Sequence, residues 1–165
     1  MRRVQVPSPL DRAIRLAYKS AYRAMRVYWA VRHPNTHGAL VGIWHQGQIL
    51  LVKNSYVPYR SLPGGYVRPG EPARQAALRE LREELGLTGL REEDLVPSVD
   101  ITHDWEGKRD HVEIFFLEVD AIPEVDIDNR EVVDWGLYTP RQALDMHLFP
   151  PVVAHIREVM ARAGK

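Results

Sequence analysis

The chain has 165 residues, of which 45% are hydrophobic and 27% are charged, and it contains no cysteine. This length fits one domain with at most one added element, and the composition is that of a soluble globular protein. Without cysteine, neither a disulfide framework nor a thiolate metal site or nucleophile is available, which fits a reducing, cytoplasmic setting. No apolar run approaches the ~18 residues of a membrane span.

The net charge of zero hides an asymmetry between the two ends of the chain. Residues 1–33 hold eight Arg or Lys residues and a single acidic residue, Asp11. A basic segment beside an acidic body favours docking on protein over binding to nucleic acid or to a membrane surface. We therefore predict an N-terminal basic helical extension over 1–33, packed against the domain formed by 34–165 or against a second copy in a homodimer.

Hydrophobic periodicity predicts a helix at the start of the chain. Apolar residues recur every three or four positions over 9–32, which indicates one apolar stripe. Its members are Leu10, Ile14, Ala17, Ala21, Met25 and Tyr28. Residues 33–38 follow as a linker or turn, because proline, asparagine and glycine interrupt the pattern. Residues 39–54 then read as two strands joined at Gln46-Gly47.

The middle and end of the chain alternate helices and strands. A loop rich in proline and glycine precedes a helix that begins near Pro72 and ends before Gly86. Two strands around a turn at Glu106-Gly107 follow, and then a strand near 132–137. Thr139 and Pro140 predict a helix through Leu148, and 152–163 reads as the last helix. This order indicates a layered α/β or α+β domain.

Three glutamates, Glu80, Glu83 and Glu84, fall within a single turn of the predicted middle helix. Each like-charged neighbour at this spacing costs roughly 0.2–0.5 kcal/mol, so something should offset the repulsion. A divalent cation such as Mg²⁺ would do so, because it takes carboxylate oxygens together with water and substrate phosphates. A solvated acidic helix face is the competing interpretation.

The spacing around these glutamates favours the metal. The stretch contains Gly65, five residues, Glu71, seven residues, and then the run Arg79, Glu80, Leu81, any residue, Glu83, Glu84, any residue, Gly86, Leu87. This stretch, Gly65 to Leu87, resembles the Nudix hydrolase family and matches its signature at every specified position. The order of the neighbouring elements extends the resemblance over roughly residues 36–163.

The resemblance implies a fold, an activity and a set of site residues. The fold is an α/β/α sandwich with a mixed sheet, here with an added N-terminal helix. The activity is Mg²⁺- or Mn²⁺-dependent cleavage of a nucleoside diphosphate linked to another group. Carried over to this chain, the metal ligands or water activators are Glu80, Glu83 and Glu84, with the Gly64 carbonyl as a backbone ligand. Arg79 and Glu71 form a supporting pair between loop and helix, and Gly65 and Gly86 complete the motif.

For the general base and for the substrate contacts, the sequence offers several candidates. Glu80 is the first choice for the base, and Glu106, Glu113 or Glu131 from later segments are alternatives. The candidates for substrate binding are Tyr59, Arg60, Trp105, Glu113 and Glu131. A metal site at His33 and His37 is disfavoured, since no further ligand is near them in the sequence.

The sequence therefore predicts a cytoplasmic pyrophosphohydrolase whose partner is a small nucleotide, such as a nucleotide sugar or a nucleoside triphosphate. Nucleic-acid binding is not expected. A Nudix-fold protein that binds a nucleotide without cleaving it is the alternative from another class, and loss of motif glutamates would be its mark. A prenyl diphosphate isomerase of the same fold would need a cysteine, which this chain lacks.

Overall fold

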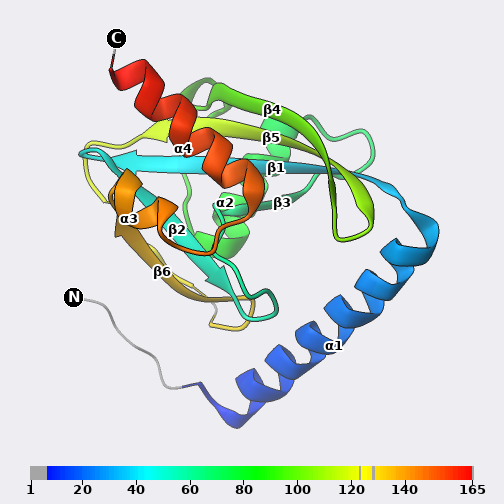
Figure 1. Cartoon of the computed structure of the whole chain (residues 1–165). Coiled ribbons are helices and arrows are strands. Elements are labelled where there is room, and N and C mark those ends of the chain that lie inside the picture. Colours follow the sequence, from blue (N-terminus) through cyan, green and yellow to red (C-terminus); the bar gives the residue numbers. More distant parts are fainter. Residues whose placement is uncertain (1–6, 123, 128, 165) are drawn as a thin grey trace.

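The computed structural model describes residues 7–122, 124–127 and 129–164, so Arg2 and Arg3 of the predicted extension lie outside it. The elements, shown in Figure 1, follow in the order α1 (Pro9–Arg32), β1 (Asn35–His45), β2 (Gln48–Asn54), β3 (Gly64–Tyr66), α2 (Ala73–Leu85), η1 (Glu92–Asp94), β4 (Val96–Trp105), β5 (Lys108–Glu118), β6 (Val132–Tyr138), α3 (Pro140–Leu144) and α4 (Pro150–Ala163). In this part of the chain, no helix has the length and apolarity needed to cross a membrane.

Over the residues that the structure describes, the sheet is mixed and has six strands. Five of them lie in the order β4-β5-β1-β2-β6, and β3 pairs with β1 beside this path. β1 and β5 run parallel, with His37 opposite His111 and Ala39 opposite Glu113. The other pairings are antiparallel. The predicted α/β fold with a mixed sheet is confirmed.

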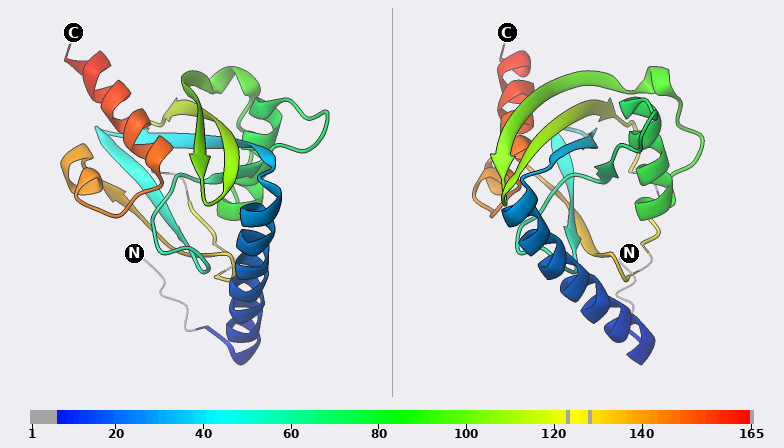
Figure 2. Two further views of the ribbon diagram at one scale, coloured as in Figure 1. Left: turned by 45° about the vertical axis from the view of Figure 1, so that its right-hand side comes forward. Right: turned by 90° about the vertical axis from the view of Figure 1, so that its right-hand side faces the viewer.

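Helices cover both faces of the sheet, as the right-hand view of Figure 2 shows for α2 and α4. Side chains alternate along β1, so the strand contributes to two cores. Ala39, Val41 and Ile43 pack with apolar residues of α2. Leu40 and Trp44 pack on the other face with apolar residues of α3 and α4.

The N-terminal helix is present at the predicted bounds, and it docks along one side of the same chain (Figure 1). Its docking face consists of Arg15, Tyr18, Tyr22, Arg26 and Trp29, which contact Asn129, Tyr56, Glu106 and Lys108. Each of these five follows a member of the predicted apolar stripe by one position, a turn of about 100° around the helix. Leu10, Met25 and Tyr28 of the predicted stripe are 47–60% exposed.

The apolar stripe expected from the sequence is therefore largely exposed, and α1 docks through a neighbouring face. Trp29 is 5% exposed, whereas the predicted stripe is partly alanine and buries little area. The aromatic side chains bury far more area than alanine and also carry polar groups that form contacts. The hydroxyl of Tyr22, for example, donates a hydrogen bond to the Glu106 carboxylate.

Two boundaries also differ from the sequence prediction. β1 begins at Asn35 inside the predicted linker, because residues from Asn35 onward pair with β5 and the Arg109 amide donates to the Pro34 carbonyl. α3 ends at Leu144 rather than Leu148. Beyond it, the backbone of His147 and Phe149 hydrogen-bonds with Arg60 instead of continuing the helix.

Candidate active site

One cavity of about 570 Å³ lies beside the motif helix. Glu80 and Glu83 of α2 line it together with Gly64 and Gly65 of β3. The other lining residues come from several elements and include eight aromatic side chains. These aromatic residues are Tyr18, Tyr22, Trp29, Tyr56, Tyr59, Tyr66, Trp105 and Phe149.

The two glycines allow β3 to pass close to its neighbours. Gly64 has φ +139°, and a side chain there would place Cβ 2.2 Å from the Ala39 carbonyl oxygen. A Cβ on Gly65 would lie 2.7 Å from the Glu80 carboxylate. Glycine at 64 therefore lets the strand run against β1, and glycine at 65 leaves room for the Glu80 carboxylate.

Arg79 connects the motif loop to the motif helix. Its Nε and Nη2 donate to the two carboxylate oxygens of Glu71 at 2.9 and 3.0 Å, and Nη2 also donates to the Tyr66 carbonyl at 3.0 Å. Its Nη1 forms an ion pair with Glu80. The hydrogen bonds from Arg79 lower the pKa of Glu71 to about 2. The contact expected between Arg79 and Glu71 is thus present, and the same guanidinium reaches Glu80.

The three motif glutamates differ in environment. Glu83 is half exposed, with a side-chain exposure of 53%. Glu84 is buried and accepts a hydrogen bond of 2.8 Å from the Gly64 amide. Burial raises the pKa of Glu84 to about 8, and the charges of Glu131 and Glu80 add to this effect. Burial also raises the pKa of Glu80, against the opposing influence of Arg79.

These carboxylates fit a divalent cation by their chemistry. Glu80, Glu83 and Glu84 offer oxygen ligands of the kind that Mg²⁺ takes. The raised pKa values reflect in part the negative charges gathered around Glu80 and Glu84, which a cation would offset. Arg79 offsets part of the charge on Glu80.

The residues predicted outside the motif divide into two groups. Tyr59, Trp105 and Glu131 line the cavity, whereas Arg60 and Glu113 are not among its lining residues. Arg60 forms an ion pair with Asp134. Glu113 follows Val112, which lines the cavity, so its side chain points to the other face of the sheet.

The general-base candidates from later segments also differ in position: Glu131 lies near the motif glutamates, whereas Glu106 contacts α1. Glu131 lies close enough to raise the pKa of both Glu80 and Glu84. It accepts a hydrogen bond of 2.8 Å from the Tyr56 hydroxyl. Glu106 lines the cavity but is engaged by Tyr22 and Arg26 of α1.

Lys108 and Asp110 are cavity residues that the sequence interpretation missed. The Lys108 ammonium donates to Asp110 at 2.8 Å and to the Tyr66 hydroxyl at 3.1 Å, and it lies 4.9 Å from the Trp29 ring centroid. Both side chains are buried. The alternation Lys108, Asp110, Val112 was the available signal, because residues two apart on a strand share a face.

The chain is similar to known proteins in sequence and in fold. The sequence profile described as NUDIX domain matches residues 35–163. A Bacillus subtilis (strain 168) protein provisionally named an 8-oxo-dGTP diphosphatase is 54% identical over 52 residues, which are 31% of this chain and 35% of that protein. An ADP-ribose pyrophosphatase of Methanocaldococcus jannaschii is 38% identical over 69 residues, which are 39% of this chain and 40% of that protein.

Solved structures show the same fold. The crystal structure of a MutT NUDIX hydrolase from Burkholderia pseudomallei superimposes with a TM-score of 0.66. It is 23% identical, and the match covers 76% of this chain and 98% of that one. The matched profile begins at residue 35, so α1 and its contribution to the cavity lie outside it.

Proposed function

Because this chain belongs to the Nudix family, we propose that it is a metal-dependent pyrophosphohydrolase that cleaves a diphosphate linkage in a nucleoside diphosphate derivative by attack of water. One observation carries the proposal: Glu80 and Glu83 of the motif line the same cavity as a set of aromatic side chains. Carboxylates suit a cation and the phosphates it accompanies, while aromatic rings suit a base. The names of two relatives, for 8-oxo-dGTP and ADP-ribose, fall within this substrate class.

Each motif residue has a role in this proposal. Glu80, Glu83, Glu84 and the Gly64 carbonyl would hold the cation, Mg²⁺ or Mn²⁺, which when bound supplies Lewis-acid chemistry and neutralises phosphate charge. The oxygen of water attacks phosphorus, the phosphoanhydride bond breaks, and a carboxylate accepts the proton of the water. Glu80 and Glu131 are the candidates for that carboxylate. Arg79 positions Glu80 and holds the loop through Glu71.

The segment 1–33 is an addition to the family domain 34–165, and we assign it a part in substrate binding. Tyr18, Tyr22 and Trp29 of α1 form one side of the cavity, and Tyr59 and Trp105 contribute to the rest of its wall. A base stacked on these rings would leave the diphosphate directed at Glu80 and Glu83. Arg68, at the same cavity, would meet the phosphates.

A nucleotide panel tests the proposal. The full chain is incubated with Mg²⁺ and nucleoside triphosphates, nucleotide sugars, 8-oxo-dGTP and ADP-ribose, and released phosphate is read with and without added phosphatase. We expect at least one substrate, no activity in EDTA, and a large loss of rate in Glu83→Gln, whose exposed position leaves the fold unchanged. Glu93→Gln is the matched control, because Glu93 is also exposed and lies outside the cavity.

Two results would count against this function. Full activity in EDTA or in Glu83→Gln would contradict the roles given to the cation and the motif. Nucleotide binding without hydrolysis of any compound would instead support the alternative of a silent nucleotide-binding protein.

A further inference from the structure

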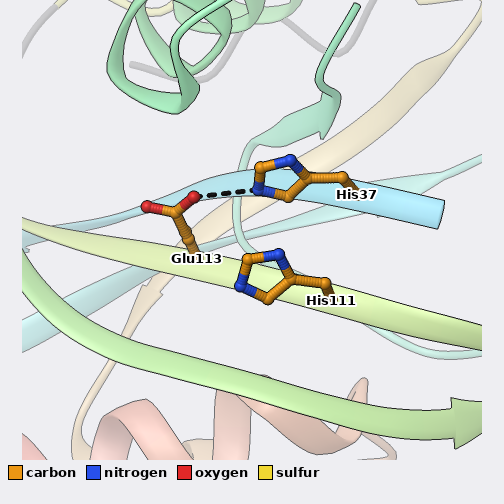
Figure 3. Close-up of side chains that lie close together, drawn as sticks. All are labelled: His37, His111 and Glu113. Atoms are coloured by element: carbon orange, nitrogen blue, oxygen red, sulfur yellow. Dashed lines mark hydrogen bonds and ion pairs between the residues drawn. The ribbon is translucent and has the colours of Figure 1, made fainter. Parts of the chain in front are cut away.

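A second cluster of metal-binding side chains lies on the face of the sheet opposite the cavity. Figure 3 shows its members, His37 of β1 and His111 and Glu113 of β5, which project from neighbouring strands towards one another. On the same two strands, Gly38, Asp110 and Val112 line the cavity. Since successive residues of a strand point to opposite faces, the three side chains point away from the cavity, towards the face of the sheet on which α2 packs.

The parallel register brings the three side chains together. His37 pairs with His111 across the two strands, and their rings stack with centroids 4.4 Å apart and planes 16° from parallel. The Nε2 atom of His37 donates to Glu113 at 2.9 Å. One ligand atom from each of the three residues lies within 4.8 Å of the others.

These distances between ligand atoms are close to those found around a bound metal ion. Zinc bonds to imidazole nitrogen and carboxylate oxygen are ~2.0–2.2 Å, so ligand atoms of a tetrahedral site lie about 3.4 Å apart. Small rotations of these side chains would close the difference. The side-chain exposures of His37, His111 and Glu113 are 35, 37 and 30%, so solvent and ions reach the cluster.

A carboxylate of β4 lies beside the three side chains of this cluster. Asp100 of β4 accepts a hydrogen bond of 2.7 Å from Nε2 of His111. A carboxylate in this position orients a ligating imidazole, or it supplies a further oxygen ligand if the ring turns. An ion bound here would join β1, β5 and β4.

We propose that His37, His111 and Glu113 bind a divalent transition-metal ion, with Zn²⁺ as the best fit. Two imidazole nitrogens and one carboxylate oxygen suit Zn²⁺, Co²⁺, Ni²⁺ and Cu²⁺, whereas Mg²⁺ prefers oxygen ligands alone. The site therefore differs from the motif glutamates in both position and preferred metal. Because it links the parallel strands at the middle of the sheet, its ion stabilises the fold and takes no part in hydrolysis.

Zinc titration of the full chain, carrying no polyhistidine tag, tests this inference. Calorimetry is performed with Zn²⁺ in excess Mg²⁺, which occupies the motif glutamates. We expect one Zn²⁺ per chain and at least a tenfold rise in Kd in both His37→Gln and His111→Gln. His45→Gln is the matched control, because His45 is a half-buried histidine of the same strand β1 and should bind Zn²⁺ as the wild type does.

Thermal unfolding gives a second readout that does not depend on activity. Zn²⁺ should raise the melting temperature of the wild type and of His45→Gln, and should raise it less in His37→Gln and His111→Gln. Equal Zn²⁺ affinity in the wild type and in both cluster variants would overturn the inference. So would Zn²⁺ binding that survives in His111→Gln and disappears in Glu83→Gln, because the ion would then lie at the cavity. Neither result depends on whether any nucleotide is hydrolysed.

Discussion

Acidifying the protein from about pH 7 to about pH 4 should remove a defined part of its stability through one buried histidine. His155 of α4 is fully buried, and its Nε2 accepts a hydrogen bond of 3.0 Å from Nε1 of Trp44. Nδ1 lies 2.8 Å from the Ser98 hydroxyl oxygen. Because the indole can only donate, the neutral ring must carry its hydrogen on Nδ1 and donate it to Ser98. Protonation at Nε2 would set two N–H groups against each other.

The magnitude follows from the pKa of this group. Burial lowers the pKa of His155 from 6.5 to about 4, and the charge of Arg162 lowers it further in the same direction. Between these values the unfolded chain binds a proton that the folded protein does not, so stability falls as the pH falls. A shift of this size corresponds to about 3 kcal/mol. In a domain of this length it equals a fall in melting temperature of about 6–12 °C.

Comparison with His155→Gln isolates this effect. The amide of glutamine can accept from Trp44 and donate to Ser98, but it does not titrate. The free energy of unfolding, measured in urea by tryptophan fluorescence, should fall by about 3 kcal/mol more in the wild type than in the variant as the pH goes from about 7 to about 4. His147→Gln, at an exposed position, should behave as the wild type. If the free energies of unfolding of wild type and His155→Gln differ by the same amount at both pH values, the reasoning is refuted.

Three further predictions concern the cavity. Glu84→Gln should lower the hydrolysis rate by at least about a hundredfold, because it removes a charged ligand; in EDTA its melting temperature should be no lower than that of the wild type, because the amide oxygen can still accept from the Gly64 amide and leaves no charge to bury; turnover near the wild-type rate at saturating Mg²⁺ would contradict this. Gly65→Ala should lower kcat by at least about tenfold with a nearly unchanged circular dichroism spectrum, because its methyl group displaces the Glu80 carboxylate; an unchanged kcat would show that the position of Glu80 does not matter. Tyr22→Ala should raise KM by about tenfold with little change in kcat. A fall in kcat with an unchanged KM would show that α1 takes no part in substrate binding.

Local signals predicted most of the elements, because the residues that fix them are adjacent in the sequence. The turn at Glu106-Gly107 is an example: both residues have positive φ, as expected of a tight hairpin turn. The start of β1 depended instead on pairing with β5, more than 70 residues later, which no local pattern reports. The docking face of α1 depended on the shape of a surface built from segments after residue 50.

In the candidate site, too, local sequence predicted some features, while others depended on residues far apart in the chain. The resemblance implied that Arg79 and Glu71 form a pair, and the structure places them in contact, with Glu80 on the same guanidinium. Outside the motif, the sequence could not say which face of β5 met the cavity. It therefore proposed Glu113, which lies on the opposite face, and missed Lys108, whose charge is offset by Asp110 and covered by aromatic rings.

The docking of α1 has a consequence for synthesis of the protein. Arg15 and its partner Asn129 are 114 positions apart, and Tyr22 and Glu106 are 84 apart. At about 5–20 residues per second, several seconds or more separate the emergence of α1 from the ribosome and that of the surface it covers. During that interval its tyrosines and tryptophan stand beside a row of arginines, exposed to the ribosome surface and to chaperones. Helix α1 is thus made well before the surface on which it docks.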